Sequence, residues 1–108
     1  MQSRINLQTG TNKFGMNHIL KEHLSGKANK SQFNMPEGEL RQLLQSNQVV
    51  SSPVVKTLES KTHGILYVRQ VDVGRAIGTD YLKNNNTTSI ITTQPDRFGN
   101  IVTAFPGI

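Results

Sequence analysis

Apolar residues in the first half of the chain recur near helical spacing in two short segments. In the first segment Asn17 can cap a helix and Gly26 can end it. We therefore predict a helix over residues 16–25. The apolar residues of this segment are Phe14, Ile19, Leu20 and Leu24.

The second segment carries a single apolar stripe made of Leu40, Leu43 and Leu44. Pro36 suits the first turn of a helix, and the two glutamates that follow it favour the positive end of the helix dipole. These features predict a second helix over residues 36–46.

Two polar stretches flank the first predicted helix. Residues 1–13 contain only a short apolar alternation from Ile5 to Leu7, so we expect a polar leader or an edge segment there. Residues 26–35 are rich in lysine, asparagine and serine, which predicts a loop between the two helices.

The pattern changes to that of β-strands in the second half of the chain. Branched and aromatic residues predict a strand over residues 64–74. Residues 75–81 can form the next strand, in which Gly78 marks a bulge or a close approach of two backbones. Residues 87–93 and 101–105 predict two further strands, the last of them stopped by a proline. Turn residues separate the last three strands at 84–86 and 94–100.

This order of elements predicts an α+β fold. Two N-terminal helices would pack on a twisted antiparallel sheet of about four strands, because the strands follow one another as hairpins without an intervening helix. A length of 108 residues suits one domain, which we place over residues 14–108. Helices on one sheet face would leave the other face free for a substrate.

Charge and composition narrow the class of partner. The 12 lysines and arginines against seven acidic residues give a net charge of +5, which favours a polyanion such as nucleic acid. The chain has no cysteine, which excludes disulfides, thiolate zinc sites and cysteine nucleophiles. No apolar stretch approaches the length of a membrane span, so we expect none.

RNA can be cut by side chains alone. A base takes the proton of the 2′-hydroxyl, an acid protonates the leaving 5′ oxygen, and cations or hydrogen-bond donors stabilise the charged phosphorane. Histidine suits the proton transfers, and arginine, lysine, threonine and tyrosine suit the phosphate. Each of these residues also has an ordinary structural explanation, since threonines form strands well and Tyr81 can belong to a core.

The chain has three histidines, His18, His23 and His63, and the first two are the candidate proton-transfer groups. On a regular helix, His18 and His23 would diverge by about 140° around the axis. Either one is structural and the other functional, or the helix ends early and His23 turns back toward the site. No third ligand stands at metal-binding spacing, so we predict no metal site and no cofactor.

Two motifs resemble a known nuclease superfamily. The segment His18-Ile-Leu-Lys-Glu-His23 is similar to a helical segment of the barnase, EndoU, colicin and RelE-like nucleases. The closing segment Gly99-Asn-Ile-Val-Thr-Ala-Phe-Pro-Gly107 is similar to the last strand of that superfamily, where a threonine precedes an aromatic-proline pair. The likeness covers roughly residues 14–107 and is closest to the tRNA-cleaving toxin domains of contact-dependent growth inhibition proteins.

The resemblance implies acid–base cleavage of RNA, with a catalytic histidine at His18 or His23 and a catalytic Thr103. Sheet geometry adds Arg75 and Tyr81 to the catalytic candidates. The expected RNA-binding residues are Lys21, Lys27, Lys30, Arg69 and Thr93.

The chain departs from two branches of the superfamily. The EndoU pattern has a second Gly-His histidine followed by a lysine, and His63-Gly64 matches it imperfectly. The barnase pattern has a strand glutamate as base, and no such glutamate is evident here. The identity of the base therefore stays open.

The resemblance also implies partners and a setting. It predicts tRNA as substrate, a cognate immunity protein that plugs the active site, and delivery to a target-cell cytoplasm as part of a larger secreted or surface-exposed bacterial protein. Some relatives use a translation factor as a cofactor, and the sequence leaves this open. The alternatives are a non-catalytic nucleic-acid-binding module and a structural or adaptor domain, both of which fit inert histidines.

Overall fold

The computed structural model describes residues 6–11, 14–25 and 30–107 of the chain. Helices and two antiparallel sheets make up this part, which confirms the predicted α+β class. The helices are α1 (Gly15–His23), α2 (Glu37–Leu44), α3 (Asn47–Val50) and the 3-10 helix η1 (Tyr81–Lys83). The strands are β1 (Gln32–Phe33), β2 (Val54–Ser60), β3 (Gly64–Asp72), β4 (Gly78–Asp80), β5 (Asn86–Thr88), β6 (Ile90–Pro95) and β7 (Ile101–Pro106).

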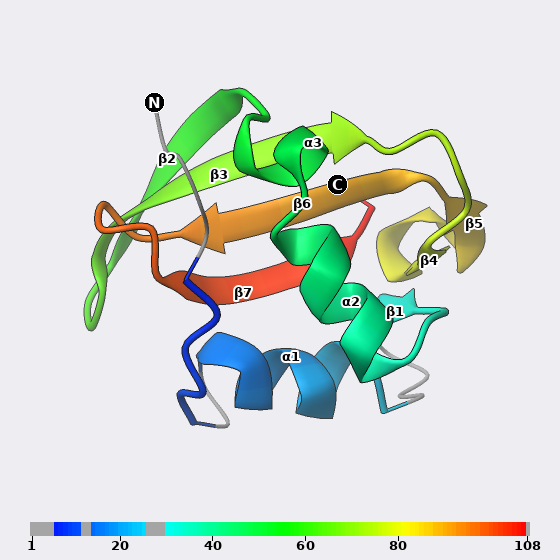
Figure 1. Cartoon of the computed structure of the whole chain (residues 1–108), viewed down its shortest axis with the longest axis horizontal. Coiled ribbons are helices and arrows are strands. Elements are labelled where there is room, and N and C mark those ends of the chain that lie inside the picture. Colours follow the sequence, from blue (N-terminus) through cyan, green and yellow to red (C-terminus); the bar gives the residue numbers. More distant parts are fainter. Residues whose placement is uncertain (1–5, 12–13, 26–29, 108) are drawn as a thin grey trace.

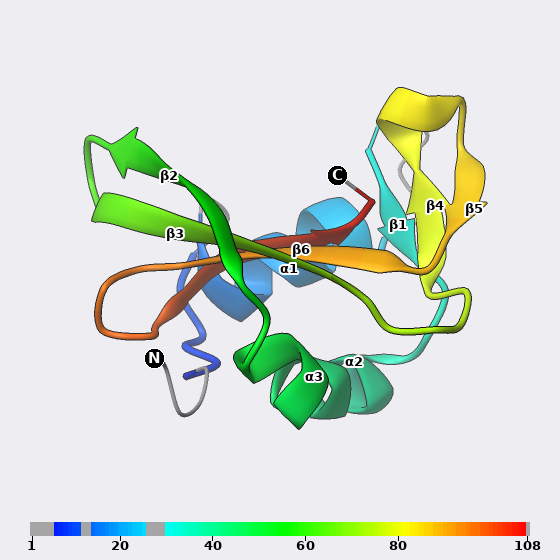
Figure 2. The ribbon, with the colours of Figure 1, turned by 90° about the horizontal axis from the view of Figure 1, so that it is seen from above.

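A four-stranded antiparallel sheet in the order β2-β3-β6-β7 forms the centre of the molecule. The helices α2 and α3 cover one face of this sheet, and α1 runs along its β7 edge (Figures 1 and 2). A second, three-stranded sheet in the order β1-β4-β5 stands beside the end of the first, close to the C-terminal end of α1 (Figure 1).

Cross-strand pairing decides which residues of the central sheet meet the helices. Ile91 pairs with Val71 on one side and with Pro106 on the other, and Thr93 pairs in the same way with Ala104. Directly opposed residues of antiparallel strands share a sheet face. Because Ile91 and Ala104 belong to the same buried cluster as the leucines of α2 and the valines of α3, this face is the one that the helices cover.

The opposite sheet face is not covered by α2 or α3 (Figure 2), although Thr92 on this face is only 1% exposed. Thr92 pairs with Gln70 and with Phe105, and Gln94 pairs with Thr103, so these residues share that face. A bulge in β7 produces this arrangement, because Gln94 pairs with Thr103 while Pro95 pairs with Ile101. The extra residue lets Ile101 turn into the helix-covered core while Thr103 and Phe105 lie on the opposite face.

The two predicted helices are present with shifted ends. α1 begins at Gly15 after an extended Phe14, so Asn17 lies inside the helix and donates from Nδ2 to Gly10 O at 3.3 Å. Pro36 precedes α2 as its N-cap and is not part of the helix. An exposed bond from Arg41 Nε to Glu37 Oε2 at 2.8 Å supports the first turns of α2.

Two predicted strands have wrong boundaries, and some elements were not predicted. Of the strand expected over residues 75–81, only β4 is a strand. The chain makes a turn at Gly74, where φ is 82°, before β4 begins. The expected strand over residues 87–93 is divided between β5 and β6, which belong to different sheets. The elements α3, β1 and β2 were not predicted at all.

The predicted role of Gly78 as a close approach is confirmed. A Cβ at this position would lie 2.1 Å from Gln32 O and 2.9 Å from Pro106 Cγ. Gly78 therefore lets β1, β4 and the end of β7 come together, and these elements surround the end of α1.

Candidate active site

Two imidazole rings meet at the C-terminal end of α1. The ring centroids of His18 and His23 are 5.6 Å apart, and the ring planes are nearly perpendicular at 73°. The helix ends at His23, since Leu24 has already left the helical region with φ −135°. The divergence expected for a regular helix is therefore wrong, and the early helix end accompanies the close approach of the two rings.

One hydrogen bond fixes the buried ring of His23. Its Nδ1 lies 2.9 Å from Ser31 O, just before β1. Because a carbonyl oxygen can only accept, Nδ1 must carry the proton and Nε2 is left with its lone pair. This arrangement leaves Nε2 as the basic atom of the ring.

Burial keeps His23 neutral at physiological pH. Desolvation lowers the pKa of His23 below its ordinary value of 6.5, and the nearby His18 and Lys30 lower it further. The Ser31 carbonyl and the charge of Glu22 act in the opposite direction and are outweighed. A neutral imidazole with a free Nε2 has the protonation state that a general base requires.

Ser31 also connects the imidazole pair to a third element. Its hydroxyl accepts a hydrogen bond from Tyr81 N at 2.9 Å, where η1 begins. Gln32 Nε2 donates to Glu22 O at 2.7 Å, which ties the start of β1 to the last turn of α1. The backbone of Tyr81 is thus held near His23, and its side chain is 43% exposed and available to a ligand.

The strand β7 brings Phe105 beside the imidazole pair. The Phe105 ring lies 5.7 Å from the His23 ring, centroid to centroid. Thr103 is the next residue along β7 on the same face as Phe105, a step of roughly 7 Å. The structure therefore brings His18, His23 and Phe105 together, and among the described residues it shows no contact between Thr103 and either imidazole.

The predicted RNA-binding lysines differ in what the structure shows of them. Lys21 on α1 and Lys30 just before β1 are both exposed, and both are close to the histidines in sequence. Lys30 is also close enough in space to lower the pKa of His23. Lys27 lies outside the described residues.

Burial corrects the prediction for Arg69 and Thr93. The two residues pair across β3 and β6 on the helix-covered face, and they are only 8% and 1% exposed. Arg69 donates from Nη1 to Ser52 O, while its Nε and the Thr93 hydroxyl have no hydrogen-bond partner in the part of the chain that the structure describes. Direct contact of these two side chains with RNA does not fit this position.

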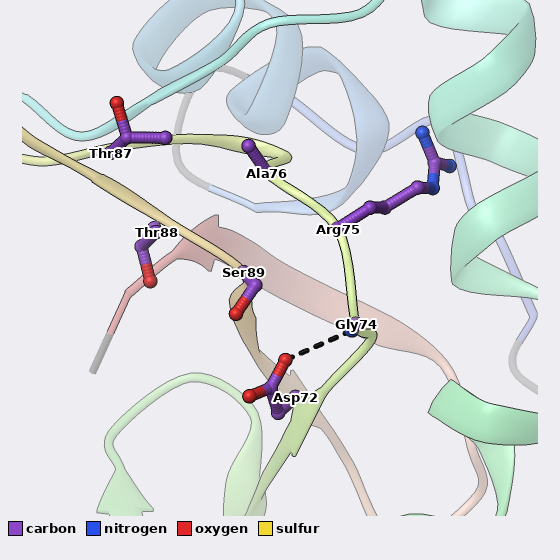
Figure 3. Close-up of a pocket in the computed structure, with 7 residues that line it drawn as sticks. All are labelled: Asp72, Gly74, Arg75, Ala76, Thr87, Thr88 and Ser89. Carbon is purple, nitrogen blue, oxygen red and sulfur yellow. Dashed lines mark hydrogen bonds between the residues drawn. The ribbon is translucent and has the colours of Figure 1, made fainter.

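Arg75 lies apart from the contacts of the imidazole pair. It lines a shallow pocket at the β3–β4 loop, where its side chain extends away from Asp72 and Ser89 (Figure 3). The side-chain hydrogen bond from Ser89 and the backbone bond from Gly74 lower the pKa of Asp72. The Asp72 carboxylate therefore closes this turn, and the structure gives Arg75 no contact that supports its predicted catalytic role.

Ser31 is the site residue that the sequence did not reveal. It lies in a polar stretch that reads as an ordinary loop, and it acts through its backbone carbonyl as well as its hydroxyl. Every residue has a backbone carbonyl, so the residue type cannot indicate which carbonyl accepts a hydrogen bond in the site. Only the fold identifies Ser31 in this role.

Comparison with family models, curated proteins and solved structures found no match for this chain. Among the described residues, no three histidine, cysteine or acidic side chains gather closely enough to hold a metal ion. The same residues include no helix with the length and hydropathy needed to cross a membrane.

Proposed function

We propose that the chain is an endoribonuclease that uses histidines, without a metal ion, for both proton transfers. The observation that carries this proposal is the pair of imidazoles at the end of α1, one of them buried, neutral and fixed with Nε2 free. The net charge of +5 supports a polyanionic substrate.

The roles of the residues follow from their surroundings. His23 Nε2 takes the proton of a 2′-hydroxyl, whose oxygen attacks the adjacent phosphorus as the bond to the 5′ oxygen breaks. His18, half-exposed beside His23, gives a proton to that leaving oxygen. The products are a 2′,3′-cyclic phosphate and a 5′-hydroxyl, so atoms and protons balance.

The remaining groups would serve the phosphate and the sugar. Lys21 and Lys30 supply positive charge, and the Thr103 hydroxyl can donate a hydrogen bond to a non-bridging oxygen. Phe105 forms the wall against which the His23 ring rests. Tyr81 is 43% exposed, and its backbone is tied to this site by the bond to the Ser31 hydroxyl.

The resemblance of the two motifs suggests the setting of this activity. We propose tRNA as the substrate and a toxin that is delivered into a target cell and neutralised by a cognate immunity protein. A basic surface suits an acidic inhibitor, because complementary charge speeds its capture.

The test is an incubation of the purified chain with total RNA in excess EDTA. The proposal predicts discrete fragments that end in 2′,3′-cyclic phosphate, detected by their resistance to ligation until the cyclic ends are opened and removed. Intact RNA that the chain nevertheless binds would favour the non-catalytic binding module. Cleavage that EDTA abolishes would contradict a mechanism based on histidines alone.

A further inference from the structure

A second cluster of exposed side chains lies at the other end of the β6–β7 hairpin. The β2–β3 turn and the β6–β7 loop together line a pocket of about 390 Å³. We name its side chains the Phe98 platform: His63, Ile65, Arg97 and Phe98. The imidazole pair does not use any of these residues.

The platform leaves large apolar side chains in water. Phe98 is 73% exposed, the largest value among the exposed apolar residues, and Ile65 beside it is 46% exposed. Several exposed apolar groups gathered in one pocket mark a contact site more often than a single exposed residue does. The platform is therefore a candidate for a ligand with an apolar face.

Positive charge accompanies this apolar surface. The Arg97 guanidinium lies over one face of the Phe98 ring, 4.8 Å from its centroid. Lys61 is exposed in the adjacent β2–β3 turn, and Glu59, which pairs with Ile65, is the nearby acidic residue on β2. The His63 ring rests on Phe14 at 4.6 Å, which anchors the platform to the start of α1.

Asp96 holds the loop that carries Phe98 in one shape. Its Oδ1 accepts hydrogen bonds from Phe98 N at 2.8 Å and Asn100 N at 3.0 Å, and its backbone carbonyl accepts from Gly99 N at 3.0 Å. Gly99 has φ 83°, a conformation that favours glycine. Phe98 is thus presented on a preorganised turn, which lowers the entropic cost of binding.

We propose that the Phe98 platform binds an unpaired base of the RNA substrate, stacked on the ring face that Arg97 leaves free. An aromatic ring with a neighbouring guanidinium is the combination that binds single-stranded RNA, because every base has a face to stack. This inference rests on the proposed ribonuclease function and names its substrate as RNA with an unpaired segment.

The two sites lie far enough apart to define a minimum substrate. β7 runs from the platform to the imidazole pair, and the step from Ile101 to Phe105 alone covers about 14 Å. More than one nucleotide of RNA must therefore link a base on the platform to a phosphate at the imidazole pair. The platform thus contacts a base that is not adjacent to the scissile phosphate.

The experiment measures binding without cleavage. A fluorescein-labelled 12-nucleotide RNA with 2′-O-methyl groups throughout cannot be cut, and its affinity is read by fluorescence anisotropy. We expect Phe98→Ala to weaken binding about tenfold, within the range found when stacked aromatics are removed, while Phe98→Trp retains it. Val55→Ala, which shortens an exposed apolar residue on β2, is the control and should bind as the unaltered chain does.

Each outcome decides the inference. Equal affinity of the unaltered chain and Phe98→Ala overturns it, and this is the outcome expected if the platform contacts a protein instead. Weakened binding by Phe98→Trp to the level of Phe98→Ala also overturns it, because indole stacks at least as well as benzene. If the chain binds the oligonucleotide through Phe98 but cuts no RNA in EDTA, the proposed function fails and the platform stands.

Discussion

At the scale of single residues, the Ser31 carbonyl determines which nitrogen of His23 can react. The hydrogen bond at Nδ1 selects one tautomer, and burial lowers the pKa so that the ring is neutral near pH 7. A neutral imidazole in a fixed tautomer is prepared to accept a proton. His18 contributes a second, more exposed ring at 5.6 Å, which suits the opposite role.

The lowered pKa of His23 predicts a pH-dependent stability. The unfolded chain binds a proton at His23 more readily than the folded chain does, so the free energy of unfolding should fall as the pH drops below about 6.5. The contribution is fully present above that pH and is lost as the pH falls through the lower pKa of the folded state. Urea unfolding at pH 7.5 and pH 5 measures it.

The variant His23→Asn provides the comparison for this measurement. Its amide nitrogen can still donate to the Ser31 carbonyl, but the side chain does not titrate. The difference in unfolding free energy between the two chains should therefore change with pH in this range. A difference that stays constant from pH 7.5 to pH 5 would contradict the lowered pKa.

The sequence predicts which residue types could act in the site, but it does not predict how they are arranged. His18, His23 and Thr103 could be chosen because their residue types suit proton transfer and phosphate binding. Arg69 and Thr93 were chosen on the same grounds, and the strand register turned both toward the helices. Residue type states what a side chain can do, whereas the face on which it lies depends on pairing and bulges.

At the scale of elements, β1, β4 and the end of β7 converge around Gly78. The absence of a side chain there permits the backbones to approach, and these strands carry or adjoin Ser31, Tyr81 and Phe105. The site therefore depends on the packing of short strands that individually have little stability.

We predict that Gly78→Ala destabilises the fold by about 1–3 kcal/mol, because its Cβ would lie 2.1 Å from Gln32 O and backbone would have to move. Gly38→Ala is the matched control. Its Cβ would meet nothing within 4 Å on α2, so it should raise stability by up to about 1 kcal/mol. Denaturant unfolding distinguishes the two, and equal effects would contradict the close packing.

Elements with a clear period could be predicted, and elements without one could not. The leucine stripe predicted the helix α2, and the run of branched residues predicted the strand β3. β2 was missed because nearly all of its residues are exposed, so its side chains show no alternation between core and solvent. β1 and α3 are two and four residues long, too short for any period to show.

At the scale of the whole molecule, α2 and α3 occupy one face of the central sheet and α1 runs along its β7 edge (Figures 1 and 2). The imidazole pair and the Phe98 platform lie toward opposite ends of β7, and the chain as a whole carries a net charge of +5, which favours a polyanionic partner. In the function that we propose, RNA would be held at the platform and cut at the imidazole pair.

The proposed histidine mechanism is tested most directly by the rate of RNA cleavage in EDTA by His23→Asn and His18→Ala, compared with Gln48→Ala on the exposed surface of α3. We expect each histidine variant to lose about 10²- to 10⁴-fold in rate while it stays folded, and Gln48→Ala to cleave normally. Cleavage at the normal rate by the folded His23→Asn variant would contradict it.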